Sequence, residues 1–114
     1  MTLDNALREI VPYVRDNMMS KLLPDLLFRD AKEFIDAHFN TILVIARTLY
    51  SVEHKALATK EDALKDLAKR HPAVSRLTAY LSKKYAGKPV RAYPGLKADM
   101  EKLAALASIE LRDF

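Results

Sequence analysis

Apolar side chains recur every three or four residues along almost the whole chain, and this spacing constrains the fold more than any other feature. Leu3, Leu7, Ile10, Val14 and Met18 form one such stripe, as expected of an amphipathic helix with one face against a core. Only two glycines and five prolines occur in 114 residues, so there is little turn material to connect many strands. The sequence therefore predicts an all-α fold.

The longest apolar stripe predicts a central helix over residues 24–50. Pro24 suits the first position of a helix, because its missing N–H would be unpaired there anyway. Residues 41–46, TILVIA, are apolar nearly all round, which is typical of a helix surrounded by others. We expect residues 1–114 to form one domain, a compact bundle of five or six helices around this long helix.

Local signals indicate where other helices bend, begin and end. Pro12 falls inside the first stripe and should bend or split that helix, because proline cannot donate a helical hydrogen bond. Thr59, with Asp62 three residues later, forms a variant of the capping box that starts a helix. Gly87 should provide the left-handed residue that ends the following helix.

Residues 69–97, KRHPAVSRLTAYLSKKYAGKPVRAYPGLK, differ from the rest of the chain in charge. They contain eight lysines and arginines and three tyrosines, but no aspartate or glutamate. The segment therefore carries +8, whereas the remaining residues sum to −4. Because a local excess of one sign constrains a protein's partners more than its total charge does, this segment is the candidate binding surface.

A helix over 73–85 would divide this segment into two faces. Leu77, Leu81 and Tyr85 should pack inward with Val74, and the basic side chains should point outward. The expected contact residues lie on the outward face and its flanks, and they are Lys69, Arg70, Arg76, Tyr80, Lys83, Lys84, Lys88, Arg91 and Tyr93.

Such a surface suits a polyanion, because lysine and arginine neutralise phosphates and exposed tyrosines stack on unpaired bases. We expect nucleic acid or a ribonucleoprotein as the partner. Two alternatives remain: contact with an acidic protein surface, and a surface that only keeps the protein soluble. The rhythm of 61–69, 70–72 and 73–85 also fits a helix-turn-helix, in which Ser75, Arg76 and Thr78 or Ala79 would face base edges.

A second candidate surface is a cluster of methionine and leucine at the end of the first helical segment, made of Met18, Met19, Leu22 and Leu23. Methionine-rich patches adapt to partner surfaces. The cluster has two interpretations, the ordinary core of a helix corner or a face for a homodimer or another protein.

The sequence offers no constellation for catalysis. There is no cysteine, and the only histidines are His38, His54 and His71, without the spacing of a helical metal site. His38 lies on the apolar stripe, where a histidine hydrogen-bonded to a neighbour is the expected role. We therefore expect no catalytic residue, no cofactor, no metal and no enzymatic activity.

The N-terminus carries two acids within nine residues, and the longest apolar run, residues 42–46, is too short for a signal peptide or a membrane span. We expect a cytoplasmic protein without a membrane partner. The combined prediction is a small non-catalytic helical binding protein, comparable to accessory subunits of nucleoprotein machines. The alternative is a protein–protein interaction module or inhibitor, such as those of phages and plasmids, that binds an acidic or apolar surface of a partner complex.

Overall fold

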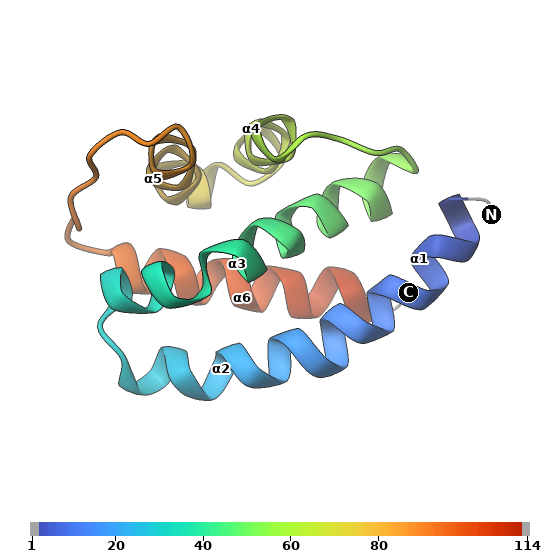
Figure 1. Ribbon diagram of the computed structural model, residues 1–114, viewed down its shortest axis with the longest axis horizontal. Coiled ribbons are helices and arrows are strands. Elements are labelled where there is room, and N and C mark those ends of the chain that lie inside the picture. The colour runs from blue at the N-terminus through green and yellow to red at the C-terminus, as the bar shows by residue number, and fades with distance from the viewer. Residues whose placement is uncertain (1–2, 113–114) are drawn as a thin grey trace.

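The N-terminal stripe forms one continuous helical rod in the computed structural model, which describes residues 3–112 (Figure 1). The rod comprises α1 (Leu3–Tyr13), a π-helical turn η1 (Val14–Met18) and α2 (Met19–Phe28). Pro12 cannot donate a helical bond to the carbonyl of Arg8, and the regular α-helix ends one residue later. The amide of Met19 then bonds to the carbonyl of Val14, five residues back. The expected disruption near Pro12 is therefore a change of helical pitch without a loop.

The central helix begins at residue 31, not at residue 24 as predicted from the sequence. Pro24 lies inside α2 on its exposed side, so the carbonyl of Ser20 that loses its helical partner can face water. The long helix α3 (Ala31–His54) starts where Asp30 caps it, because the Asp30 carboxylate accepts hydrogen bonds from the amides of Lys32 and Glu33 at 3.1 and 3.3 Å.

The helix α3 is the centre of the bundle and packs against α1, α2, α4 (Lys60–Arg70) and α6 (Leu96–Arg112). Many of its large apolar side chains are fully buried, among them Phe34, Ile35, Ile42, Leu43 and Leu49. Residues 3–112 contain no strand, and the predicted all-α bundle with a long central helix is confirmed. No helix among these residues is long and apolar enough to cross a membrane.

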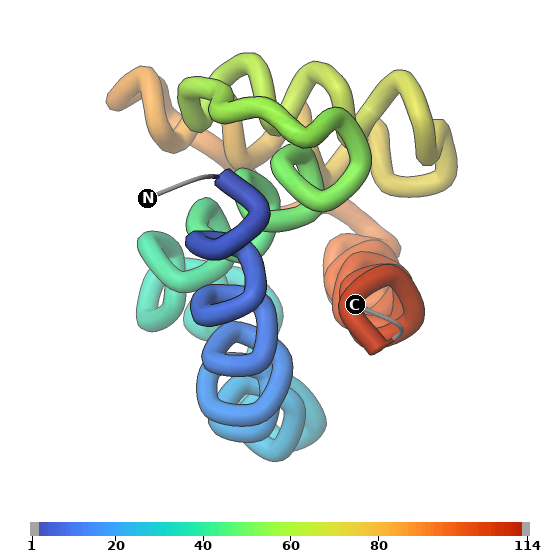
Figure 2. Tube along the Cα trace, turned by 90° about the vertical axis from the view of Figure 1, so that its right-hand side faces the viewer, coloured from blue at the N-terminus to red at the C-terminus, as the bar shows by residue number. Residues whose placement is uncertain are grey.

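The helices α4 and α5 (Ser75–Tyr85) lie side by side, joined by a 3₁₀ turn η2 (Pro72–Val74), and cross over α3 (Figure 1, Figure 2). Thr59 caps α4 as predicted, because its hydroxyl accepts the amide of Asp62 at 3.1 Å. Gly87 ends α5 as predicted, with φ +77°. Its amide bonds to the carbonyl of Lys84, and the next amide bonds to that of Lys83.

The helix α3 is kinked at His38, where the backbone adopts φ −118° and ψ 22°. The His38 Nε2 atom lies 2.6 Å from Asp25 Oδ2, so the kink is tied to α2 by a side-chain hydrogen bond. Asp25 also pairs with Arg29 at 2.9 Å. The expected role of His38 as a hydrogen-bonded histidine on a largely apolar face is confirmed.

Candidate functional site

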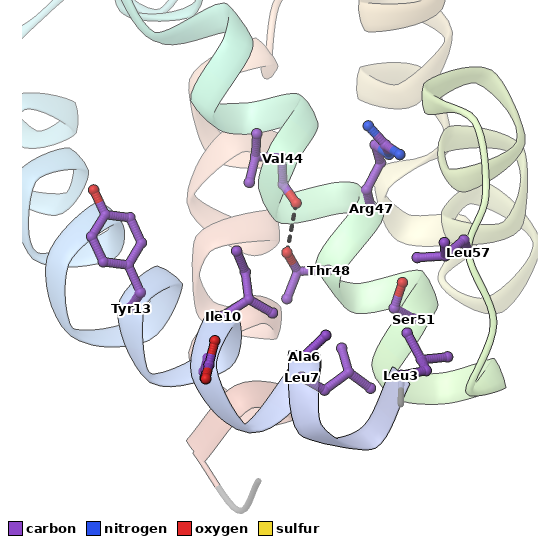
Figure 3. Close-up of a pocket in the computed structure, with 11 residues that line it drawn as sticks. Leu3, Ala6, Leu7, Ile10, Tyr13, Val44, Arg47, Thr48, Ser51 and Leu57 are labelled. Atoms are coloured by element: carbon purple, nitrogen blue, oxygen red, sulfur yellow. Dashed lines mark hydrogen bonds between the residues drawn. The ribbon is translucent and has the colours of Figure 1, made fainter. Parts of the chain in front are cut away.

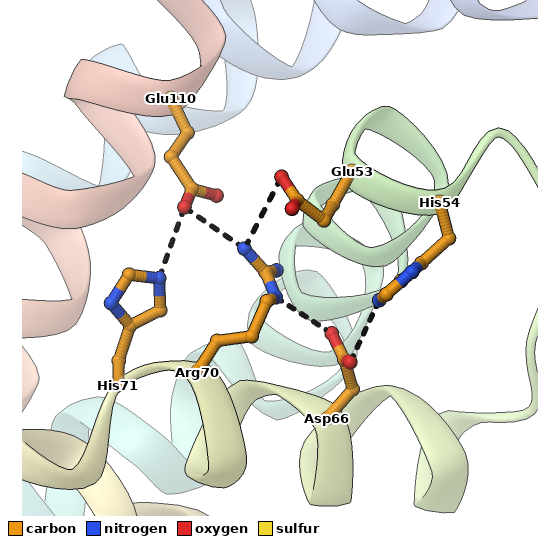
Figure 4. A network of polar contacts seen from close by, with 6 residues as sticks. All are labelled: Glu53, His54, Asp66, Arg70, His71 and Glu110. Atoms are coloured by element: carbon orange, nitrogen blue, oxygen red, sulfur yellow. Dashed lines mark hydrogen bonds and ion pairs between the residues drawn. The ribbon is translucent and has the colours of Figure 1, made fainter.

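Arg70 was expected in the basic patch, but it lies in a network of acids between helices (Figure 4). Its Nε is 2.8 Å from Asp66 Oδ2, and its Nη1 is 3.1 Å from Glu110 Oε1 and 3.7 Å from Glu53 Oε2. The side chain is only 18% exposed. Because these acids come from α3, α4 and α6, the guanidinium joins three helices and is not available to a polyanion.

Two histidines extend this network (Figure 4). His54 Nε2 lies 2.7 Å from Asp66 Oδ1, and His71 Nε2 lies 3.0 Å from Glu110 Oε1. Burial raises the pKa of Asp66, but the hydrogen bonds from Arg70 and His54 outweigh burial, so this pKa lies below its usual value. Asp66 is therefore held ionised beside the Arg70 guanidinium.

Lys84 is also neutralised within the fold. Its Nζ lies 2.6 Å from Asp36 Oδ1 and 5.2 Å from the centre of the Phe39 ring. The hydrogen bond from Lys84 lowers the pKa of Asp36. Lys84 therefore connects α5 to the first turns of α3 and, unlike Lys83, is paired with an acid.

The two tyrosines of α5 have exchanged the positions expected for them. Tyr80 is 5% exposed and Tyr85 is 44% exposed, whereas the sequence places Tyr80 outside and Tyr85 inside. The reason is the loop over residues 86–95, which brings Tyr93 against Tyr80 with ring centres 6.5 Å apart and edge to face. This loop covers a flank of α5 that helical periodicity alone leaves exposed.

Three of the exposed basic side chains that form no ion pair come together in one hollow between α5 and the loop. The hollow measures about 480 Å³. We call it the basic hollow, and its lining consists of Arg76, Ala79, Tyr80, Lys83, Pro89, Val90, Arg91 and Tyr93. Arg76, Lys83 and Arg91 are exposed and form no ion pair with any carboxylate of residues 3–112. The basic hollow therefore presents three uncompensated positive charges.

Tyr93 forms one side of the basic hollow and is held in place by a hydrogen bond. Its hydroxyl donates a hydrogen bond of 2.6 Å to Asp99 Oδ2 at the start of α6, and burial together with this bond raises the pKa of Tyr93. The guanidinium carbon of Arg76 lies 4.4 Å from the centre of the Tyr93 ring, within the range of a cation–π contact. Sequence analysis missed Asp99 as a supporting residue, because an acid six residues after Tyr93 gives no signal of its own.

Two other expected contact residues lie outside the basic hollow. Lys69, near the end of α4, and Lys88, directly after Gly87, are exposed, and neither forms an ion pair with another described residue. They add positive charge to the surface without lining the site. Five of the nine expected contact residues line the hollow: Arg76, Lys83, Arg91, Tyr93 and the buried Tyr80.

The helices α4 and α5 do not cross as the two helices of a helix-turn-helix do. They run antiparallel, side by side (Figure 2), whereas helix-turn-helix pairs meet at roughly 90–120°. Thr78 is buried and its hydroxyl donates to the carbonyl of Ser75 at 2.9 Å, so it cannot face a base edge. The geometry is that of a helical hairpin.

The methionine and leucine cluster belongs mainly to the core. Met19 and Leu22 are buried, and Met18 is half-buried against the core. For Met19 and Leu22, the ordinary core of a helix corner is therefore the interpretation that fits, because α2 packs against α3 and α6. Leu23 alone is exposed, and it lines a shallow groove shared with the exposed Ile109 of α6.

An apolar groove of about 610 Å³ lies between α1, α3 and the loop after α3 (Figure 3). Its exposed apolar side chains are Ile10, Tyr13 and Leu57, of which Leu57 is 76% exposed. Two polar side chains of the wall are bonded internally: the Thr48 hydroxyl donates to the carbonyl of Val44 at 2.8 Å (Figure 3), and Arg47 Nε donates to the carbonyl of Ala58 at 3.0 Å. The groove therefore offers a partner mainly apolar surface.

The basic hollow and the apolar groove are the basis for inferring a function, because comparisons with known proteins supply none. Within residues 3–112, no group of three histidine, aspartate or glutamate side chains is placed to hold a metal ion. No family model matches the chain, and neither the curated proteins nor the solved structures gave a match.

Proposed function

We propose that this chain is a small non-catalytic binding protein that docks on a nucleic acid or ribonucleoprotein through the basic hollow. One observation carries the proposal: Arg76, Lys83 and Arg91 converge on a single hollow from α5 and the following loop, without acidic partners among the described residues. By contrast, Arg70 and Lys84, from the same basic segment, are paired with acids, among them Glu110 of α6 and Asp36 of α3.

Uncompensated cations that share one surface favour polyanions for a physical reason. Each lysine or arginine that neutralises a phosphate releases condensed counterions, so affinity falls steeply as salt rises. Lys69 and Lys88 are exposed near the ends of α4 and α5 and can add to the long-range attraction. An extended phosphate backbone provides several charges for such a surface, which a single acidic side chain does not.

The test is fluorescence anisotropy with labelled oligonucleotides, titrated from low to physiological salt. The test variant combines Arg76→Ala, Lys83→Ala and Arg91→Ala. The matched control combines Arg8→Ala, Lys21→Ala and Arg112→Ala. It also removes two arginines and one lysine, but from exposed positions on α1, α2 and α6. The proposal expects the test variant to lose affinity while the control retains most of it. Equal loss in both variants would leave only a general effect of charge.

A second candidate function, protein–protein contact, is favoured by the apolar groove between α1 and α3. Exposed apolar surface of this kind often marks an interface, and the simplest partner is a second copy of the chain. Sedimentation velocity over a range of concentrations, with wild type beside a Leu57→Ser variant, tests it. Self-association that the substitution weakens supports this function, and a monomer at every concentration contradicts it.

A further inference from the structure

We infer that the basic hollow accepts one unpaired nucleotide, with its base stacked beside the Arg76–Tyr93 pair and its phosphates on Lys83 and Arg91. The inference rests on the proposed function, because it specifies which form of nucleic acid the same site binds. It is carried by the shape of the site, by the chemistry of its walls and by the way its aromatic side is held.

The shape of the site differs from what a duplex backbone requires. Phosphates on a duplex form exposed ridges, which flat or protruding basic surfaces contact from outside. The basic hollow has a volume of about 480 Å³, within the range of roughly 300–1,000 Å³ that is usual for small-molecule sites. Bases of a duplex are stacked inside the helix and cannot enter such a space, whereas an unpaired base can.

The chemistry of the walls also indicates a base. Alongside the three cations, the hollow is lined by Ala79, Pro89 and Val90, which contribute apolar surface. Contact between an apolar wall and a hydrated phosphate is not favourable. Contact with a flat aromatic group is favourable, because it removes apolar surface from water. A nucleotide matches both parts of the lining, since its base is largely apolar on its faces and its phosphate is anionic.

The Arg76–Tyr93 pair provides a flat stacking surface. The guanidinium is planar, and at 4.4 Å from the centre of the tyrosine ring it covers one side of that ring. Unpaired bases in nucleic-acid complexes stack on aromatic rings and on arginine guanidinium planes. Arg76 can therefore offer both a positive charge and a plane to the incoming nucleotide, which a lysine at this position cannot.

The aromatic side of the hollow is held in place by the fold. Tyr93 is bonded to Asp99 at 2.6 Å and rests edge-on against the buried Tyr80. At the start of the loop, the amides of Gly87 and Lys88 bond to the last turn of α5 at 3.1 and 3.0 Å. A site whose parts are already ordered loses less conformational entropy when a ligand binds.

The test compares polyanions with and without accessible bases. Wild-type protein is titrated at one salt concentration with a labelled single strand, an abasic strand of equal length, a blunt-ended duplex and heparin. Ribose and deoxyribose versions of the single strand are both included. We expect the single strand to bind roughly 5- to 100-fold more tightly than the abasic strand, as one stacked base provides.

A charge-preserving variant separates stacking from electrostatic attraction. Arg76→Lys should weaken the single strand at least about fivefold, and leave heparin and the abasic strand within about twofold of wild type, because the charge is retained. Arg8→Lys is the control, since it makes the same replacement at an exposed position of α1 that does not line the hollow, and it should leave single-strand binding unchanged.

Two outcomes overturn the inference, and they are distinguishable. If the abasic strand or the duplex binds as tightly as the single strand, the hollow contacts phosphates only, and the proposed function stands without the nucleotide. If none of the four polyanions binds even at low salt, the proposed function itself fails. Neither result depends on a variant that could misfold, because both are obtained with the wild-type protein.

Discussion

The ammonium group of Lys84 lies 2.6 Å from the carboxylate of Asp36, so neighbouring lysines of α5 have different roles. Lys83, one residue earlier, lines the basic hollow without an acidic partner among the described residues. The pair joins α5 to α3, whereas Lys83 remains available to an anion. This difference between adjacent cations can be measured directly.

Replacing Lys84 should leave nucleic-acid binding intact, whereas replacing Lys83 should weaken it. Lys84→Met keeps an aliphatic chain over Phe39 and should lower the free energy of unfolding by less than about 1 kcal/mol, because the ion pair is partly exposed. Lys83→Met should instead make the salt dependence of oligonucleotide binding shallower by about 0.7–0.9 in the logarithmic slope, the contribution of one phosphate. If the two variants change the slope equally, this assignment of roles is wrong.

Arg70 should matter for stability, and its neighbour Lys69 should not. Arg70→Met leaves Asp66 and Glu110 without their shared guanidinium and should cost about 2 kcal/mol, less than for a fully buried pair because the side chain is partly exposed. Lys69→Met removes an exposed charge with no ion pair to another described residue and serves as the control. Urea denaturation followed by circular dichroism measures both, and equal midpoints would contradict the network's structural role.

The unfolding free energy should decrease as the pH falls below about 4. The pKa values of Asp25 and Asp36 are lowered in the folded protein mainly by hydrogen bonds from His38 and Lys84, respectively. The pKa of Asp66 is lowered because the hydrogen bonds from Arg70 and His54 outweigh the opposing effect of burial. A carboxyl group whose pKa is lower in the folded than in the unfolded protein stabilises the fold at pH values above its unfolded-state pKa. This stabilisation is lost as the pH falls through its folded-state pKa.

The Asp66→Asn variant tests this pH dependence. It should unfold more easily than wild type near neutral pH, and the difference between the two should shrink as the pH falls through the lowered pKa of Asp66, where the wild-type carboxylate takes up a proton. Urea midpoints at several pH values provide the measurement. A difference that stays constant over this range would show that ionisation of Asp66 contributes nothing.

Two tyrosine-to-phenylalanine substitutions should have opposite consequences. The buried Tyr80 hydroxyl makes no hydrogen bond to any described residue, so Tyr80→Phe should be neutral or stabilise by up to about 1 kcal/mol. Tyr93→Phe removes the hydroxyl that donates to the buried Asp99 and should destabilise by about 1–2 kcal/mol, since Asp99 keeps only the longer contact with Lys102 at 3.6 Å. Thermal unfolding of both variants checks this, and destabilisation by Tyr80→Phe would reveal a partner for its hydroxyl.

The helices could be predicted from the sequence because their signals are local. Apolar spacing indicated the bundle and the central position of α3, and Thr59 and Gly87 marked helix ends correctly. The start of α3 was placed wrongly, at Pro24, although Asp30 followed three residues later by Glu33 is itself a helix-start signal. A proline on an exposed helix face proved compatible with an uninterrupted α2.

The candidate site could be predicted only in part, because its composition depends on residues far apart in the sequence. The absence of acids from 69–97 indicated a basic surface, but Asp36 and Glu110, which neutralise Lys84 and Arg70, lie outside that segment. Likewise, helical periodicity does not show which flank of α5 a following loop covers, and so it misplaced Tyr80. Such pairings become visible only once the helices are packed.

The central claim is that Arg76, Lys83 and Arg91 form a phosphate-contacting site, and the salt dependence of oligonucleotide binding tests it most directly. For the triple alanine variant at these positions, the account predicts a logarithmic salt slope shallower than wild type by roughly two to three units, one per lost phosphate contact. The control triple variant on α1, α2 and α6 should keep the wild-type slope. Identical slopes for wild type and the Arg76, Lys83 and Arg91 variant, with unchanged helicity, would contradict the claim.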